Sequence, residues 1–121
     1  MIKIMVGGQL DKAKVLEEIK KYPSEGISAE IKSDFEAAIA VKNGEADYYF
    51  GSCATGAGGS LAGAIAMLGY DKCATVSMPG ISPDYNKIEN YVKDGKKAFG
   101  FTNNHIETAV SYLLKAIIDN L

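Results

Sequence analysis

The sequence has no arginine and no tryptophan among its 121 residues, and it has a single histidine. Its thirteen basic residues are therefore all lysines, and the formal net charge is −2. Arginine is the usual bidentate reader of phosphate and of guanine, and nucleic-acid-binding domains carry a basic surface. Both features are missing, so a nucleic-acid partner is not expected.

Cysteine is also scarce, with only Cys53 and Cys73, which disfavours a secreted disulfide scaffold. The first apolar run, residues 2–6, stops at Gly7 and is too short for a signal peptide or a membrane span. We therefore expect a cytoplasmic protein with no membrane partner. The spacing of the two cysteines does not match a metal-ligand pattern, and we expect neither a metal nor a cofactor.

Hydrophobic residues make up 47% of the chain, which is enough for one core without a disulfide or metal. Without linkers or repeats, residues 1–121 are expected to form a single α/β domain. Strands are predicted at 2–6, 27–31, 47–50, 73–78 and 97–101, and helices at 11–22, 35–42, 60–68, 85–93 and 104–121. Ser33 or Asp34 is the expected cap of the second helix, and Asn103 or Asn104 that of the last.

This alternation predicts a three-layer α/β/α fold with about five parallel strands joined by right-handed crossovers. We expect a flavodoxin- or Rossmann-like sheet with the strand order 2-1-3-4-5. The helix at 60–68 is apolar on nearly all sides, which predicts burial against the sheet or against a second subunit. A homodimer is therefore expected.

The segment Gly51–Ser60 reads GSCATGAGGS and joins the third strand to this apolar helix. Glycines let a ligand approach the main chain closely, and successive N–H groups at a helix start bind anions. The predicted partner is a small anionic or phosphorylated metabolite. The ligand-binding residues predicted here are Gly51, Ser52, Cys53, Thr55, Gly56, Gly58, Gly59 and Ser60. The alternative is that the glycines serve only the close packing of a tight connection.

Further candidates follow from the predicted topology, in which ligands bind beyond the carboxyl ends of strands 1 and 3. Gly8 and Asp11 follow the first strand and are predicted to bind the ligand, although Asp11 also suits a helix cap. His105 is a candidate acid–base group because histidine titrates near neutral pH, or else a solvated residue at a helix start. Cys53 precedes a helix N-terminus, which lowers a thiol pKa, but free cysteines are also common as inert core residues.

A resemblance to a known family rests on residues 47–58, on the Gly69-Tyr70 turn and on residues 79–81. Together with the apolar helix, these segments resemble the bacterial YhfU-type family, a domain of unknown function, over nearly the whole chain. A more distant likeness links the chain to the glycine-rich SFCGS family. These resemblances imply a family but no activity.

A second, local resemblance covers residues 53–62. The pattern Cys53-x-Thr55-Gly56-x-Gly58-x-Ser60 is similar to the cysteine loop of B-type ribose-5-phosphate isomerases. The resemblance implies that Cys53 is a base that moves a proton between adjacent carbons and that Thr55 assists at the sugar ring. It also implies that the main chain of Gly56 and Gly58 binds the enediolate. Unlike those enzymes, the chain has no histidine between residues 7 and 11.

Three functions therefore remain open from the sequence. The first is binding of a small anion at Gly51–Ser60, and the second is isomerase-like proton transfer with Cys53, Thr55 and His105 as catalytic residues. The third is a non-catalytic subunit or regulatory module that works through partner contacts, for which the helix at 60–68 and the last helix offer apolar surface.

Overall fold

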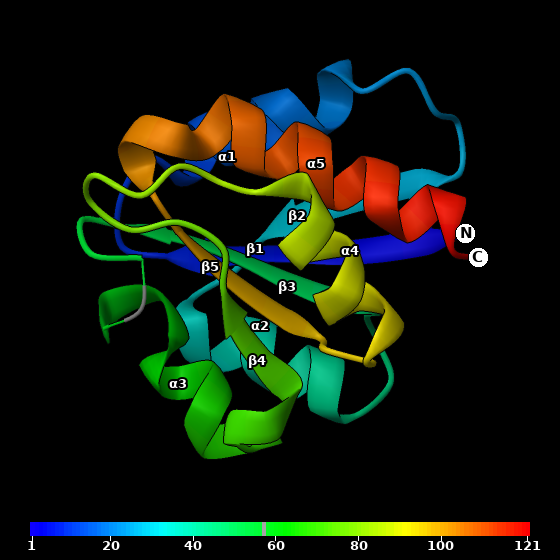
Figure 1. Cartoon of the computed structure of the whole chain (residues 1–121). Helices are drawn as coiled ribbons and strands as arrows, with labels where there is room; N and C mark the ends of the chain where they lie inside the picture. The colour runs from blue at the N-terminus through cyan, green and yellow to red at the C-terminus, as the bar shows by residue number, and fades with distance from the viewer. Residues whose placement is uncertain (57) are drawn as a thin grey trace.

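The computed structural model describes residues 1–56 and 58–121. Five strands form one parallel sheet in the order β2-β1-β3-β5-β4, with helices on both faces (Figure 1). The strands are β1 (Ile2–Gly8), β2 (Ile27–Ile31), β3 (Tyr48–Cys53), β4 (Cys73–Thr75) and β5 (Ala98–Thr102). The helices are α1 (Lys12–Lys21), α2 (Asp34–Lys42), α3 (Gly58–Leu68), α4 (Tyr85–Lys93) and α5 (Ile106–Asp119), with two 3₁₀ turns, η1 (Tyr70–Lys72) and η2 (Asn103–His105).

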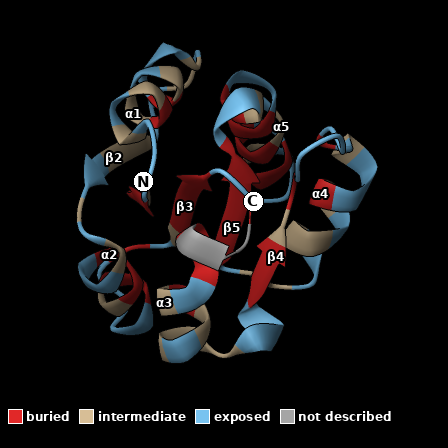
Figure 2. Ribbon diagram, turned by 90° about the vertical axis from the view of Figure 1, so that its left-hand side faces the viewer, coloured by how far each residue is buried: buried red, intermediate tan, exposed pale blue. Residues whose placement is uncertain are grey.

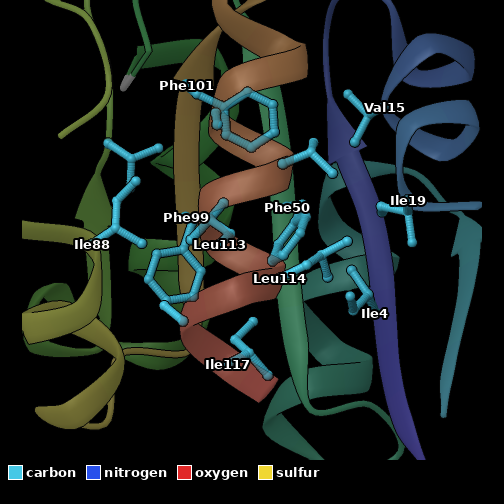
Figure 3. Close-up of a cluster of buried hydrophobic side chains, with 14 of the residues drawn as sticks. Ile4, Val15, Ile19, Phe50, Ile88, Phe99, Phe101, Leu113, Leu114 and Ile117 are labelled. Atoms are coloured by element: carbon cyan, nitrogen blue, oxygen red, sulfur yellow. The ribbon is translucent and has the colours of Figure 1, made fainter. Parts of the chain in front are cut away.

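Each face of the sheet has its own apolar core, because successive strand side chains point to opposite faces. Helices α1, α4 and α5 cover the face that carries Phe50, Phe99 and Phe101, whose rings meet edge to face (Figures 1 and 3). Helices α2 and α3 cover the other face, which carries Tyr49 and packs against Leu61. Strands β1, β3, β4 and β5 are mostly buried between these two layers, whereas the edge strand β2 is half-buried to exposed (Figure 2).

Local signals explain most of the helix boundaries. Ser33 caps α2 as predicted, since its hydroxyl accepts a hydrogen bond from the N–H of Glu36. Asp11 occupies the N-cap position of α1 with φ 57°, but its side chain makes no capping bond. The predicted caps of the last helix, Asn103 and Asn104, lie instead in η2, and α5 begins after His105.

The predicted strand order 2-1-3-4-5 is wrong at its last two positions. β5 lies between β3 and β4, so that β4 is the edge strand. All five residues of β5 are buried, as suits a central parallel strand. β4 ends at Thr75 rather than at the predicted Met78, because Ser77 turns its hydroxyl to the N–H of Thr102 in place of a main-chain acceptor. The expected switch point between β1 and β3 is unaffected by this change.

The apolar helix, predicted to be buried against the sheet or against a second subunit, is buried against the sheet only on one side. Helix α3 buries Leu61 and Ala64 against the sheet, whereas Ala62 and Ala66 are exposed and Ile65 is half-buried. The chain therefore leaves an apolar face of α3 uncovered. Among the described residues, no helix is both long and apolar enough to cross a bilayer.

Candidate functional site at the carboxyl edge of the sheet

The candidate site lies where β1, β3 and β5 end side by side. Gly8 is the register partner of Ser52, and Cys53 is the register partner of Thr102. The loop after β1 closes over β3, because the N–H groups of Gln9 and Leu10 both donate to the carbonyl of Ser52, at 2.8 and 3.2 Å. The two loops that the sequence places at the switch point therefore do meet.

Strand β3 continues through Cys53, so the first three residues of the predicted turn are strand and not loop. Gly58 and Gly59 begin α3, and their surroundings lie outside what the structure describes. The connection between strand and helix is thus shorter than the sequence suggests. This brings the Cys53 side chain directly against the first turn of the helix.

The glycines at this edge allow parts of the chain to approach one another. A Cβ atom on Gly8 would lie 2.4 Å from the Ser52 main chain, and one on Gly56 would lie 2.0 Å from the Ser77 carbonyl oxygen. Gly56 also has φ +87°, which favours glycine. A Cβ on Gly51 would lie 2.9 Å from the Ser60 carbonyl oxygen. Close packing, the alternative reading of these glycines, is therefore a real requirement at all three positions.

Main-chain N–H groups of two predicted ligand-binding glycines have partners within the chain. The N–H of Gly8 donates to the Asp34 carboxylate at 2.6 Å, and that of Gly56 donates to Cys53 Sγ at 3.1 Å. The Gly56 N–H accordingly faces the sulfur atom of Cys53. This N–H already has a hydrogen-bond partner within the chain, and the reactive group of the segment is the Cys53 side chain.

Cys53 Sγ is surrounded by hydrogen-bonding groups. Besides the Gly56 N–H, the Ser60 hydroxyl lies 3.3 Å from the sulfur and the Thr55 hydroxyl 3.6 Å from it. The neutral thiol donates to Ser60, and both hydroxyls can rotate to donate to the thiolate. Cys53 is only 3% exposed, so the sulfur makes its hydrogen bonds to these protein groups and not to bulk water.

The surroundings of the two cysteines shift their pKa values in opposite directions. Burial raises the pKa of the Cys53 thiol, but hydrogen bonds from Ser60, Thr55 and the Gly56 N–H outweigh it, so the pKa falls to about 7. Burial raises the pKa of Cys73, which a nearby lysine, Lys96, lowers only in part. Near neutral pH, Cys53 therefore has substantial thiolate character and Cys73 remains a thiol.

His105 is held at the same edge by a pair of buried hydroxyls. Its Nδ1 lies 2.6 Å from Thr102 Oγ1, which in turn lies 3.2 Å from Ser77 Oγ. Cys53 and Thr102 are register partners in a parallel pair, so their side chains share one face of the sheet. The structure thus connects His105 to the strand position next to Cys53.

Three further residues at this edge differ in their burial and contacts. Asp11 is exposed and accepts a hydrogen bond from the Asn103 amide at 3.1 Å, which ties the loop after β1 to η2. Ser52 is completely buried on the sheet face opposite Cys53, and its hydroxyl has no hydrogen-bond partner among the described residues. Tyr49 donates to the Ser60 carbonyl and anchors the first turn of α3. Desolvation raises the pKa of Tyr49, so it stays a neutral donor.

The sequence analysis missed three residues that shape this edge: Thr102, Gly100 and Asp34. Thr102 was overlooked because the predicted strand stopped at Phe101, although a polar residue directly after a buried apolar strand was a usable signal. Gly100 has no sequence signal that separates it from an ordinary strand residue. A Cβ atom there would lie only 2.3 Å from the Gly56 carbonyl oxygen and 2.8 Å from the Ser60 hydroxyl. No group of three or more histidine, cysteine, aspartate or glutamate side chains within the described part of the chain is arranged to hold a metal ion.

The fold and this edge define an all-parallel, doubly wound α/β protein with a cysteine at the carboxyl end of a central strand. The chain belongs to the family described as "Protein of unknown function DUF2620", whose model matches residues 2–117. It is 40% identical over 114 residues to the uncharacterized protein YhfU of Escherichia coli K12 and to that of Shigella flexneri. Each alignment covers 94% of this chain and 97% of the relative. The predicted family is therefore confirmed.

Among solved structures, the chain is similar to a ribose 5-phosphate isomerase from Thermotoga maritima. The TM-score is 0.65 at 15% sequence identity, over 97% of this chain and 86% of that one. At this level of identity the similarity shows a shared fold, and the sequence resemblance to these enzymes is borne out to that extent.

Proposed function

We propose that the carboxyl edge of the sheet binds a small anionic metabolite and that the Cys53 thiolate is the base for a proton transfer on it. The observation that carries the proposal is the set of three hydrogen-bonding groups around Cys53 Sγ, namely the Gly56 N–H, which donates to it, and the hydroxyls of Thr55 and Ser60. An inert core cysteine needs no such set, whereas a catalytic base with a pKa near the working pH does.

In the proposed reaction, the thiolate removes a proton from a carbon next to a carbonyl group, and the electron pair moves to the carbonyl oxygen. When that carbon also carries a hydroxyl group, the product of this step is an enediolate. The resulting thiol returns the proton to the former carbonyl carbon and the hydroxyl proton passes to the other oxygen, which completes an isomerisation without a cofactor. The exposed Thr55 lies beside the sulfur and is suited to contact the substrate. Helix α3 begins at Gly58, and the positive end of its dipole favours an anionic substrate there.

Phosphorylated sugars are the first substrates to test, because the fold is shared with a ribose 5-phosphate isomerase. The panel consists of aldose and ketose phosphates, phosphorylated amino acids and inorganic phosphate, screened by thermal shift. A ligand of the folded state is expected to raise the melting temperature in a concentration-dependent manner. Absence of a shift with every member of the panel would contradict the binding part of the proposal.

The catalytic part is tested with the ligand that the screen identifies. In deuterated water, the wild-type protein is expected to exchange the carbon-bound proton, which NMR follows directly. Cys53→Ser should retain the thermal shift and lose the exchange by about 100-fold or more, the scale of general-base catalysis. Cys73→Ser is the matched control and should keep both. Exchange that persists in Cys53→Ser would exclude this residue as the base.

A second candidate function is that of a subunit that works through contacts, with a homodimer as its simplest form. It is favoured by a groove of about 520 Å³ between α3 and the β4 edge, whose apolar lining includes Leu61, Ile65, Tyr70 and Met78. Tyr70 is 81% exposed, which is unusual for a large aromatic side chain without a partner. Light scattering tests this candidate: a dimer that Tyr70→Lys converts to a monomer supports it, and a monomeric wild-type protein contradicts the homodimer.

A further inference from the structure

Three side chains form a hydrogen-bonded chain that runs from the interior to the carboxyl edge. Ser77 Oγ accepts a hydrogen bond from the Thr102 N–H at 3.0 Å and lies 3.2 Å from Thr102 Oγ1. Thr102 Oγ1 then contacts His105 Nδ1 at 2.6 Å. The two hydroxyl side chains are 2% and 1% exposed, whereas the imidazole is half-buried. This series of hydrogen bonds is therefore buried at its Ser77 end and reaches the surface at its His105 end.

The direction of these hydrogen bonds follows from counting protons and acceptors. If Ser77 donates to Thr102 and Thr102 donates to Nδ1, both buried hydroxyl protons have an acceptor. If Nδ1 carried a proton and donated to Thr102, one hydroxyl proton would have no acceptor among the described residues, whichever way Thr102 turned. Leaving a buried polar group without its hydrogen bond is unfavourable. The first direction is therefore preferred.

We propose that the buried Ser77–Thr102 pair is a positioning device that holds His105 as the neutral tautomer protonated on Nε2. Nδ1 faces the buried pair as an acceptor, and the Nε2–H lies on the opposite edge of the ring as a hydrogen-bond donor. Which nitrogen carries the proton is set by the bond that the other one makes. Thr102 and Ser77 act through His105 and are positioning residues.

The ligand class that this donor suits is a carbonyl or oxyanion oxygen. His105 lines a cavity of about 200 Å³ together with Asn103, Asn104 and Lys14. Lys14 is engaged by Glu18 at 3.0 Å and by Glu107 at 3.4 Å, so its charge is largely balanced. The Asn103 amide already donates to Asp11, so the Nε2–H of His105 is the neutral donor proposed for this cavity.

This assignment divides the chemistry between two residues, a step that rests on the proposed function. In the proposed reaction Cys53 is the base, and the His105 N–H is the hydrogen-bond donor for the oxygen on which negative charge develops. The two residues are linked through Thr102, which contacts His105 and is the register partner of Cys53.

The tautomer can be read directly, because His105 is the only histidine in the chain. In ¹⁵N-labelled ligand-free protein, at a pH where the ring is neutral, long-range ¹H–¹⁵N correlation distinguishes protonated from unprotonated ring nitrogens. We expect Nε2 to carry the proton and Nδ1 to accept from a slowly exchanging Thr102 hydroxyl proton. A ring protonated on Nδ1 in the wild-type protein would overturn the proposal without any variant.

Three variants separate positioning from a merely structural role. Thr102→Val keeps the shape of the side chain and removes the hydroxyl, so the fraction of Nδ1–H tautomer should rise several-fold. Thr102→Ser restores the hydroxyl and should restore the wild-type spectrum. Ser111→Ala removes an exposed hydroxyl outside both the chain of bonds and the His105 cavity, and it should leave the tautomer ratio unchanged. A tautomer ratio that is the same in Thr102→Val and in the wild type overturns the proposal.

The outcome is independent of whether a substrate has been found, because the spectrum is recorded without ligand. If exchange activity is established, Thr102→Val should lower kcat by about tenfold or more while the ligand-induced thermal shift is retained. Loss of activity in Cys53→Ser together with a mixed tautomer in the wild type would refute the positioning device and leave the proposed function intact.

Discussion

The surroundings of Cys53 differ from those of an ordinary core cysteine at the level of single atoms. Three hydrogen-bonding groups face its sulfur, whereas Cys73 Sγ contacts only the Gly69 carbonyl, at 3.5 Å, among the hydrogen bonds of the described chain. A thiolate is stabilised in the first environment and disfavoured in the second. The sequence left a reactive and an inert Cys53 open, because the position of the Ser60 hydroxyl depends on where α3 begins.

The opposite pKa shifts of the two cysteines predict opposite effects of pH on stability. The folded pKa of Cys53 lies below that of an unfolded thiol, so its stabilising contribution is present above the unfolded pKa and is lost as the pH falls through about 7. The difference in free energy of unfolding between wild type and Cys53→Ser should therefore widen by about 1–2 kcal/mol from about pH 6 to about pH 9.

Urea unfolding of reduced protein measures this difference, and Cys73→Ser is the control with the opposite sign. The raised pKa of Cys73 makes its contribution present below the unfolded pKa and lost as the pH rises above it. The free energy of unfolding of the wild type minus that of Cys73→Ser should accordingly decrease from about pH 6 to about pH 9. If the free energies of unfolding of the two serine variants change in parallel with pH, the surroundings do not shift the two thiol pKa values in opposite directions.

At the level of elements, the fit between β5 and the start of α3 determines the geometry of the cysteine. Gly100 on β5 leaves room for the helix turn: a Cβ there would lie 2.3 Å from the Gly56 carbonyl oxygen, 2.7 Å from Leu61 Cγ and 2.8 Å from Ser60 Oγ. The residues that hold the thiolate are therefore the ones that a side chain at position 100 would displace.

Gly100→Ala is predicted to destabilise the protein by about 1–3 kcal/mol, the usual cost of overpacking. It should also raise the pKa of Cys53, because Ser60 and Gly56 move away from the sulfur. Gly26→Ala is the matched control, since nothing lies within 4 Å of a Cβ there, and its stability should stay within about 0.5 kcal/mol of wild type. Urea unfolding measures the stability of both variants. A Gly100→Ala variant as stable as the wild type would contradict the close approach of the α3 start to position 100.

Most element positions could be predicted because they depend on local patterns. The strand at 27–31 and the helix at 85–93 match the sequence prediction, and Ser33 caps α2 as its side-chain chemistry suggests. The ends of β3, β4 and α5 could not be placed, because each is set by a contact with a distant part of the chain. Ser77 illustrates this, since its hydroxyl ends the ladder of β4 by bonding a residue 25 positions away.

For the molecule as a whole, the layered α/β architecture was predictable, but the neighbours of β4 and β5 were not. Both segments are short and apolar, so their local patterns fit either position in the sheet. What decides the order is that β5 is buried on both faces, between β3 and β4, while β4 is only three residues long. Burial on both faces is a property of the assembled layers and not of the segment.

Amide hydrogen exchange tests this order. The amides of β5 should exchange only through global unfolding, because this strand lies inside the sheet and carries Phe99 and Phe101 of the main core. The amides of β4 should exchange about tenfold faster or more, as expected of a short edge strand. Stronger protection of β4 than of β5 would restore the order 2-1-3-4-5.

The pKa of Cys53 in the wild-type protein is the most direct test of the proposed chemistry. It is obtained from the ultraviolet absorbance of the thiolate as the pH is raised, taking the difference between wild type and Cys53→Ser. We predict a midpoint near 7 that rises in Ser60→Ala, which removes one donor. A midpoint at about 8.5, the value of an unperturbed thiol, would contradict the account.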